Sequence, residues 1–309
     1  MTGRRQFLSG LSAAMVATAA RPAQASTDYR DVIFIHINGM NVISGAPGLT
    51  TLGRILSSAT WFREGFAAGL TPRDEVLTMR SGRYPHQLGH VGAGAAQWDR
   101  LDSSAPALLN DMFNSIGYSH YHLTDDGTVL TTHPVGRRTG VIVEISVERR
   151  RNEPHLAPLR RLEARLAQIT AQFDMTSRSA PLVAVVSTPS SFVADAWTNR
   201  RVDFGLAPPA GTGTRYDSTR VSSVDLVPTL LDWAGAEAAA QRLPGRSLLE
   251  GGQVGDRVEE RRIYMSRNYT GIGQFAPIRA MRPSHFLIAQ SLGAAAGMGR
   301  LHADLQRFD

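Results

Sequence analysis

The chain has 309 residues, of which 42% are hydrophobic, so it can bury a large core without a disulfide or a structural metal. All 33 basic residues are arginines, which disfavours any mechanism that needs a lysine, and the absence of cysteine excludes thiolate metal sites and a cysteine nucleophile. The formal net charge is +6, but the arginines are scattered and the short runs at 149–151 and 261–262 are flanked by glutamates. We therefore expect solvated surface charge and no nucleic-acid partner.

The N-terminus has the organisation of an export signal. Arg4 and Arg5 precede an apolar stretch that runs from Leu8 to Ala20, and a small-x-small cleavage pattern follows at 23–25. A twin arginine followed by Phe-Leu resembles the address of the twin-arginine pathway. The apolar run is shorter than the roughly 20 residues that span a bilayer. The sequence therefore predicts a signal peptide over 1–25, a periplasmic or secreted protein, and no membrane span after cleavage.

Strand and helix patterns alternate along the rest of the chain. Three short apolar runs are typical of buried parallel strands, and two amphipathic patterns predict helices. In chain order these elements are a strand over 32–37, a helix over 107–116, a strand over 141–147, a helix over 159–173 and a strand over 181–187, followed by a Gly- and Pro-rich loop over 205–213. This alternation predicts one α/β domain over 27–309, with a mainly parallel sheet sandwiched by helices and a small C-terminal subdomain from about 260. Ligands of such sheets bind at the carboxyl ends of the strands, here after Ile37 and Ser187.

Several short motifs carry a resemblance to a known family. Ser81-Gly-Arg-Tyr-Pro-His-Gln-Leu-Gly is similar to the signature that follows the nucleophile of sulfatases, and His120-Tyr-His-Leu lies where that family has Lys-Trp-His-Leu. The segment from Val221 to Gly235, followed by Gly245-Arg-Ser-Leu, is the strongest match. The matches are colinear from residue 32 to residue 288. They resemble the sulfatase branch of the alkaline phosphatase superfamily and imply the α/β fold of that family, with the small subdomain at the carboxyl end.

The resemblance implies a metal-dependent site that this chain does not preserve. The family holds a divalent cation, usually Ca²⁺, with two Asp after the first strand and with Asp and Asn or His after a later one. Here the positions that resemble the first acidic pair hold His36 and Ile37. Compared with the phosphodiesterase-like relatives, which have Asp-Gly at this place, the matching residue is Asn38. The later positions read Ser187-Thr-Pro-Ser. Neutral oxygens and one imidazole lack the charge that Ca²⁺ requires. His36 and Asn38 are weak metal candidates, and we expect no bound cation; calcium is the expected cofactor if the protein is active.

The nucleophile position is also changed. The family's Cys or Ser lies ten residues before the position of Gly82, where this chain has Pro72. Thr71 is the nearest hydroxyl, but a Thr-Pro-x-Asp sequence is also typical of a helix start with Thr as its cap. The family's arginine after the nucleophile has no clear equivalent, although Arg73 or Arg80 lies within reach.

Histidines are the part of the implied site that remains. His122 and His155 match the family's two ester-contacting histidines, and each can alternatively be a structural histidine. The main hypothesis is an exported, catalytically degenerate sulfatase-like protein, a possible pseudoenzyme, that binds a sulfate or phosphate ester, an anionic glycan or a partner protein. The alternative is an active, divergent ester hydrolase that uses Thr71, His122 and His155. A serine esterase is disfavoured because the chain lacks a Gly-x-Ser-x-Gly elbow.

Overall fold

The structure is a computed structural model, and it describes most of the chain between Arg30 and Ser291. The described residues are 30–40, 42, 49–69, 72–88, 107–136, 140–150, 152–175, 177, 179–188, 201–209, 214–250, 253–254, 263–267, 278–282, 286–291 and 306–307. The predicted signal peptide over 1–25 and the candidate nucleophile Thr71 lie outside these residues.

In the described part of the chain, eight strands form the main sheet in the order β4, β3, β5, β1, β6, β7, β2, β8. Strands β3, β5, β1 and β6 are parallel, and β2 is parallel to β8, whereas β4 and β7 are antiparallel to their neighbours. The bounds are β1 Val32–Asn38, β2 Thr60–Phe66, β3 Tyr118–Leu123, β4 Val129–Thr132, β5 Gly140–Glu148, β6 Leu182–Thr188, β7 Asp203–Ala207 and β8 Arg215–Ser222. The predicted mainly parallel sheet is confirmed.

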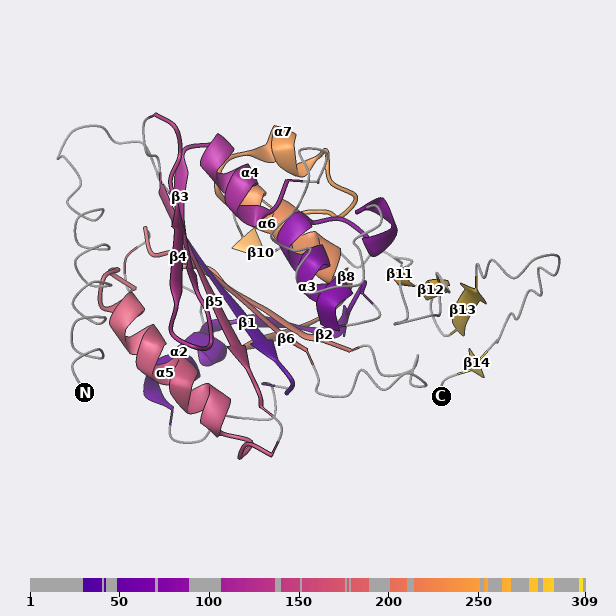
Figure 1. The fold of residues 1–309 in the computed structure, drawn as a ribbon, viewed down its shortest axis with the longest axis horizontal. Helices are drawn as coiled ribbons and strands as arrows, with labels where there is room; N and C mark the ends of the chain where they lie inside the picture. Colours follow the sequence, from indigo (N-terminus) through magenta and orange to yellow (C-terminus); the bar gives the residue numbers. More distant parts are fainter. Residues whose placement is uncertain are drawn as a thin grey trace.

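Helices cover both faces of this sheet (Figure 1). Helices α2 and α5 pack on one face with Ile33, Ile35 and Ile37 of β1, and α3, α4 and α6 pack on the other face with Val32 and Phe34. Because successive side chains of a strand point to opposite faces, an apolar run such as that of β1 is buried on both sides. The bounds are α2 Thr50–Ser58, α3 Pro72–Ser81, α4 Leu109–Ser115, α5 Ala157–Thr170, α6 Leu226–Trp233 and α7 Glu237–Ala240.

The two predicted helices are present. Helix α4 occupies the predicted 107–116 segment, and α5 buries Leu159, Leu162, Leu166 and Ile169 along one side, as their spacing indicated. Helix α5 ends at Thr170, so Phe173 packs against the same core from beyond the helix.

The predicted loop over 205–213 is wrong at its beginning. Gly205, Leu206 and Ala207 belong to β7, which lies between β6 and β2. A Cβ atom at Gly205 would lie 2.8 Å from the ring of Trp61, so the glycine is present for close packing and not for a turn.

The segment that carries the strongest sequence match forms a structural anchor. The buried Asp225 accepts hydrogen bonds from the backbone of Ser222 (2.8 Å) and Arg246 (2.9 Å), and Thr229 donates to the backbone oxygen of Asp225 at 2.6 Å. These contacts fix the 3-10 helix η4 Ser223–Asp225 and α6 beside β8.

Smaller sheets complete the described part of the chain. Strands β9 Leu249–Glu250 and β10 Gln253–Val254 pair with each other. A four-stranded antiparallel sheet contains β11 Ile263–Arg267, β12 Ile278–Arg282, β13 Phe286–Ser291 and β14 Gln306–Arg307. Tyr264 of β11 makes an edge-to-face contact with Tyr84, beside the 3-10 helix η1 Pro85–Gln87. Among the described residues, no helix is both long and apolar enough to cross a bilayer.

Candidate functional site

A row of hydrogen-bonded polar side chains lies at the carboxyl ends of the three central strands. Asn38 ends β1 and stands in register with Glu148 of β5 and Thr188 of β6. The Thr188 hydroxyl donates to the amide oxygen of Asn38 at 3.0 Å, and the amide nitrogen of Asn38 donates to Glu148 at 3.3 Å. Two positions that the resemblance assigned to metal ligands, Asn38 and Thr188, are therefore direct neighbours.

This row does not fit a calcium site. Ca²⁺ takes six to eight oxygen ligands with several carboxylates among them, whereas the row holds an amide, a hydroxyl and one carboxylate that already contact one another. Ile37 cannot contribute, because its side chain is fully buried in the core on the α5 side. Ser187 donates to Asp203 at 2.8 Å, and Asp203 also accepts from the backbone of Val42. Among the described residues, no three His, Asp or Glu side chains are placed to hold a metal ion.

A second polar cluster, which we call the Glu144 cluster, lies on the α3 side of the sheet and comprises Arg80, His120, His122, Glu144 and Ser146. Glu144 projects from the middle of β5 and is 2% exposed. Its carboxylate lies 3.0 Å from His120 Nε2, 3.4 Å from Arg80 Nε and 3.7 Å from His122 Nε2. His122 Nε2 also lies 3.0 Å from the hydroxyl of Ser146. Helix α3 supplies the cation, and strands β3 and β5 supply the other groups.

The surroundings of Glu144 keep its carboxylate ionised. Burial alone would raise its pKa, but Arg80, the hydrogen bond from His120 and the charge interaction with His122 together lower the pKa from 4.5 to about 2. An ionised carboxylate only accepts hydrogen bonds, so His120 Nε2 carries the hydrogen that joins the two residues. Burial lowers the pKa of His122, and Arg80 and His120 lower it further, against the opposing effect of Glu144.

His36 lies on the same face of the sheet, beside the Glu144 cluster. Its ring stacks on Phe34 with 6.5 Å between the ring centroids, and its Nε2 has no hydrogen-bond partner among the described residues. Burial lowers the pKa of His36 to about 4; Glu144 opposes this shift, and His122 and Arg80 add to it. The imidazole is therefore neutral at physiological pH.

The beginning of helix α3 contains an internal acid. The helix begins at Pro72, as the sequence predicted, and Glu75 in its first turn is fully buried. The Glu75 carboxylate accepts the backbone hydrogen of Gly69 at 2.8 Å. The positive end of this helix dipole, where the resemblance places the nucleophile, thus has a protein carboxylate beside it.

The two predicted histidines lie in different surroundings, one buried and one exposed. His122 lies in the Glu144 cluster on the α3 side. His155 is exposed in the turn that leads into α5, which packs on the opposite face. Of the candidates in the described residues, the structure brings Asn38 to the row at the strand ends and His122 into the Glu144 cluster, with His36 beside that cluster.

Sequence reasoning did not identify Glu144, and it named Arg80 only as one of two arginines within reach. A signal for Glu144 is present, because it is a charged residue inside the apolar run from 141 to 147 that was predicted as a central strand. A charge at such a position needs a buried partner. Arg80, in the last turn of α3, is that partner.

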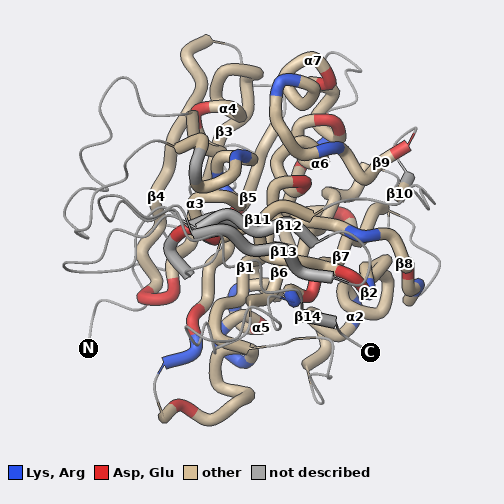
Figure 2. Tube along the Cα trace, turned by 90° about the vertical axis from the view of Figure 1, so that its right-hand side faces the viewer, with Lys and Arg blue, Asp and Glu red and all other residues tan. Residues whose placement is uncertain are grey.

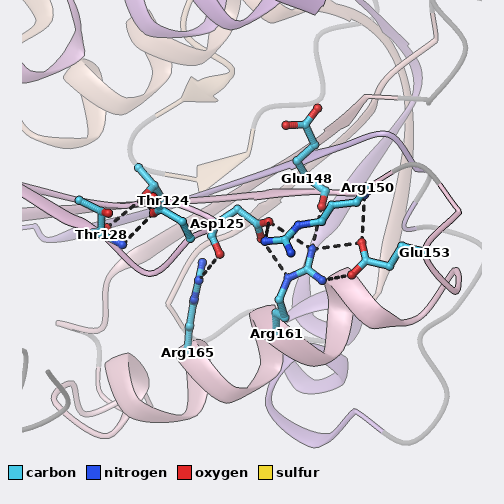
Figure 3. Close-up of polar contacts among 9 residues, drawn as sticks. Thr124, Asp125, Thr128, Glu148, Arg150, Glu153, Arg161 and Arg165 are labelled. Carbon is cyan, nitrogen blue, oxygen red and sulfur yellow. Dashed lines mark hydrogen bonds and ion pairs between the residues drawn. The ribbon is translucent and has the colours of Figure 1, made fainter. Parts of the chain in front are cut away.

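A third group of charges ties the turn after β3 to helix α5 (Figure 3). Arg161 of α5 contacts the carboxylates of Asp125 and Glu153 and donates to the backbone oxygen of Glu148 at 2.7 Å. Arg165 donates to the backbone oxygen of Asp125 at 2.8 Å. Arg150, which is 65% exposed, adds a longer contact to Asp125. These pairs hold the β3–β4 turn and the segment after β5 against α5.

Elsewhere the charges are dispersed over the described elements (Figure 2).

Comparison with known proteins identifies the fold. No family model matches the chain, and no curated protein matches it. Solved structures do match. One is a protein in complex with its substrate D-glucosamine-2-N,6-O-disulfate, with 10% identity, a TM-score of 0.63 and 91% of each chain covered. Another is a 2-O glycosaminoglycan sulfatase, with 13% identity, a TM-score of 0.55, and 86% of this chain and 83% of the other covered.

A third match is a protein of the alkaline phosphatase superfamily from Vibrio parahaemolyticus, with 10% identity and a TM-score of 0.53, covering all of this chain and 91% of the other. The chain therefore has the sulfatase-like α/β fold of the alkaline phosphatase superfamily. The expected fold is confirmed, and at these identities the likeness concerns the fold alone.

Proposed function

We propose that the protein is an exported, sulfatase-like protein that binds an anionic, sulfated or phosphorylated ligand without hydrolysing it. The observation that carries this proposal is the row of Thr188, Asn38 and Glu148 at the strand ends. In this fold a cation there would neutralise the oxygens of an ester, and an amide bonded to a hydroxyl cannot supply that charge. The solved relative in complex with a disulfated glucosamine supports a sulfated sugar as the ligand class.

The segment after β5 offers contacts for such a ligand. His155 is exposed, and Arg150, earlier in the same segment, is largely exposed. Both follow the carboxyl end of a central strand, where ligands of α/β sheets bind. An exposed arginine and an imidazole can donate hydrogen bonds to the oxygens of a sulfate or phosphate group.

The alternative function is an active, divergent ester hydrolase that uses Thr71, His122 and His155. The surroundings of His122 disfavour it, since this histidine is buried and engaged with Ser146 beside the Glu144 carboxylate, whereas His155 is exposed in the turn before α5. Calcium would be the expected cofactor of that enzyme.

Calorimetric titration separates these functions. Metal-free protein is titrated with Ca²⁺, Mg²⁺, Mn²⁺ and Zn²⁺, and the same sample is assayed with an aryl sulfate and an aryl phosphate. We expect no stoichiometric cation binding, no turnover, and saturable binding of a sulfated disaccharide but not of its desulfated form. Turnover that is abolished by Thr71→Ala would establish the hydrolase instead.

Export is tested separately. A variant in which Arg4 and Arg5 are both replaced by lysine should accumulate unprocessed inside a bacterial host that has a twin-arginine pathway, whereas the natural chain should be processed and found in the periplasm. Equal export of both chains would contradict the twin-arginine assignment.

A further inference from the structure

Glu144 places a full negative charge inside the sheet, on the face that carries His122, one of the two histidines expected to contact an ester. Its carboxylate faces Arg80, His120 and His122, and all four side chains are buried or largely buried. The groups on this face that could bind an anion therefore already surround the carboxylate of Glu144.

The charges of this face are matched without a ligand. Arg80 is positively charged at any physiological pH, and Glu144 is negatively charged because Arg80 and His120 stabilise its ionised form. His36 and His122 are buried imidazoles with lowered pKa values, so burial keeps them from adding positive charge. A second anion at this place would face the carboxylate in a medium of low polarity, where like charges repel strongly.

Hydrogen-bonding capacity nevertheless remains beside the carboxylate. Among the described residues, two buried imidazole nitrogens of this face have no hydrogen-bond partner: His36 Nε2 and His122 Nδ1. Buried polar atoms are normally paired, so unpartnered nitrogens on β1 and β3, the two strands that flank β5, could serve an oxyanion if the Glu144 carboxylate were neutral.

We propose that Glu144 is the specificity-determining residue of this face: its carboxylate acts as a built-in anion that excludes sulfate and phosphate groups from Arg80, His120 and His122. The anionic ligand must then bind outside the Glu144 cluster, toward the strand ends and the segment after β5. This inference rests on the proposed function only in that both concern an anionic ligand.

The test uses inorganic sulfate with the full chain, Glu144→Gln and the control Glu250→Gln. The control removes an exposed acid of β9 that belongs neither to the Glu144 cluster nor to the row at the strand ends. We expect Glu144→Gln to bind sulfate at least about tenfold more tightly than the natural chain, the equivalent of about 1.4 kcal/mol. The control should behave as the natural chain does. The double variant Arg80→Met/Glu144→Gln should lose the gained affinity.

Folded Glu144→Gln that gains no affinity for sulfate would overturn the proposal, as would an equal gain in Glu250→Gln. A second measurement needs no variant of Glu144. In the natural chain labelled at histidine, the imidazole nitrogen signals of His120 and His122, assigned with His120→Gln and His122→Gln, should not move as sulfate is added. Saturable movement of both signals would refute the exclusion.

The two proposals fail in distinguishable ways. A sulfated disaccharide that binds the natural chain and leaves the His120 and His122 signals unmoved supports both. Binding that moves these signals supports the proposed function and overturns the role of Glu144. Absence of disaccharide binding counts against the proposed function, and the comparison of Glu144→Gln with the natural chain in sulfate still decides the role of Glu144.

Discussion

Replacement of Arg80 by methionine tests the energetics of the Glu144 cluster. The substitution keeps an unbranched chain in the last turn of α3 but removes the cation 3.4 Å from the Glu144 carboxylate. Removal of one partner of a buried ion pair typically costs about 3 to 5 kcal/mol, because the other charge stays buried without compensation. The cost here should be smaller, since Arg80 is 24% exposed and His120 still donates to Glu144.

The pKa of Glu144 gives a second way to derive the stability that Arg80→Met should lose. A folded-state pKa of about 2 against 4.5 corresponds to about 3 kcal/mol of stabilisation at neutral pH, and Arg80 is the largest favourable contributor to it. We therefore expect Arg80→Met to lower the free energy of unfolding by about 2 to 3 kcal/mol at pH 7.

The pH dependence has a defined sign. Glu144 has a lowered folded-state pKa, so its stabilising contribution is complete above pH 4.5 and is lost as the pH falls from 4.5 toward 2. The difference between the natural chain and Arg80→Met should therefore be largest at pH 7 and should shrink below pH 4.5.

Urea unfolding followed by tryptophan fluorescence measures this difference, with Arg54→Met on the exposed side of α2 as the control. The control should change stability by less than about 0.5 kcal/mol. A loss for Arg80→Met no greater than that of the control at pH 7, or a difference that grows as the pH falls below 4.5, would refute the reasoning.

Three further variants test other parts of the structure by the same unfolding measurement. His36 has a folded-state pKa of about 4 against 6.5, so the free energy of unfolding of the natural chain should fall by about 2 kcal/mol between pH 7 and pH 5 because of this residue. The variant His36→Phe should not show this fall, and a variant with the same pH profile as the natural chain would contradict the prediction. Arg161→Met should cost about 1 kcal/mol and the exposed Arg150→Met close to nothing, and equal effects would show that the network of Figure 3 is not organised by Arg161. Gly205→Ala should lower the free energy of unfolding by about 1 to 3 kcal/mol because its Cβ atom would meet the ring of Trp61. Gly53→Ala, which has open space around it in α2, should raise it by about 0.5 to 1 kcal/mol. A Gly205→Ala variant as stable as the natural chain would show that β7 has room to shift.

Much of the fold could be predicted because the central strands and α5 have simple patterns. Buried parallel strands are short apolar runs, and the spacing of Leu159, Leu162 and Leu166 matches the period of a helix. The beginning of β7 was misassigned because glycine normally indicates a turn, and the need for Gly205 arises only from the ring of Trp61 on the neighbouring strand. Such a contact depends on which strands become neighbours, which local pattern does not specify.

The candidate site could be predicted where it depends on strand ends. Since the carboxyl ends of parallel strands meet at one edge of a sheet, the neighbouring positions of Asn38 and Thr188 follow from the strand pattern. The buried setting of His122 and the exposed setting of His155 could not be predicted, because burial depends on which elements pack against each side chain. Glu144 was missed because a search guided by resemblance examines the positions that the family uses, and the buried ion pair lies at none of them.

The most direct test of the central claim restores the missing carboxylates. Calorimetry with Ca²⁺ is carried out on the natural chain and on the double variant Asn38→Asp/Thr188→Asp, whose two substitutions lie side by side at the strand ends. We expect no measurable binding to the natural chain and stoichiometric binding to the double variant, with a dissociation constant on the order of 10⁻⁴ to 10⁻³ M, typical of weak calcium sites. Stoichiometric Ca²⁺ binding to the natural chain that is abolished by Asn38→Ala would contradict the loss of the metal site at this row.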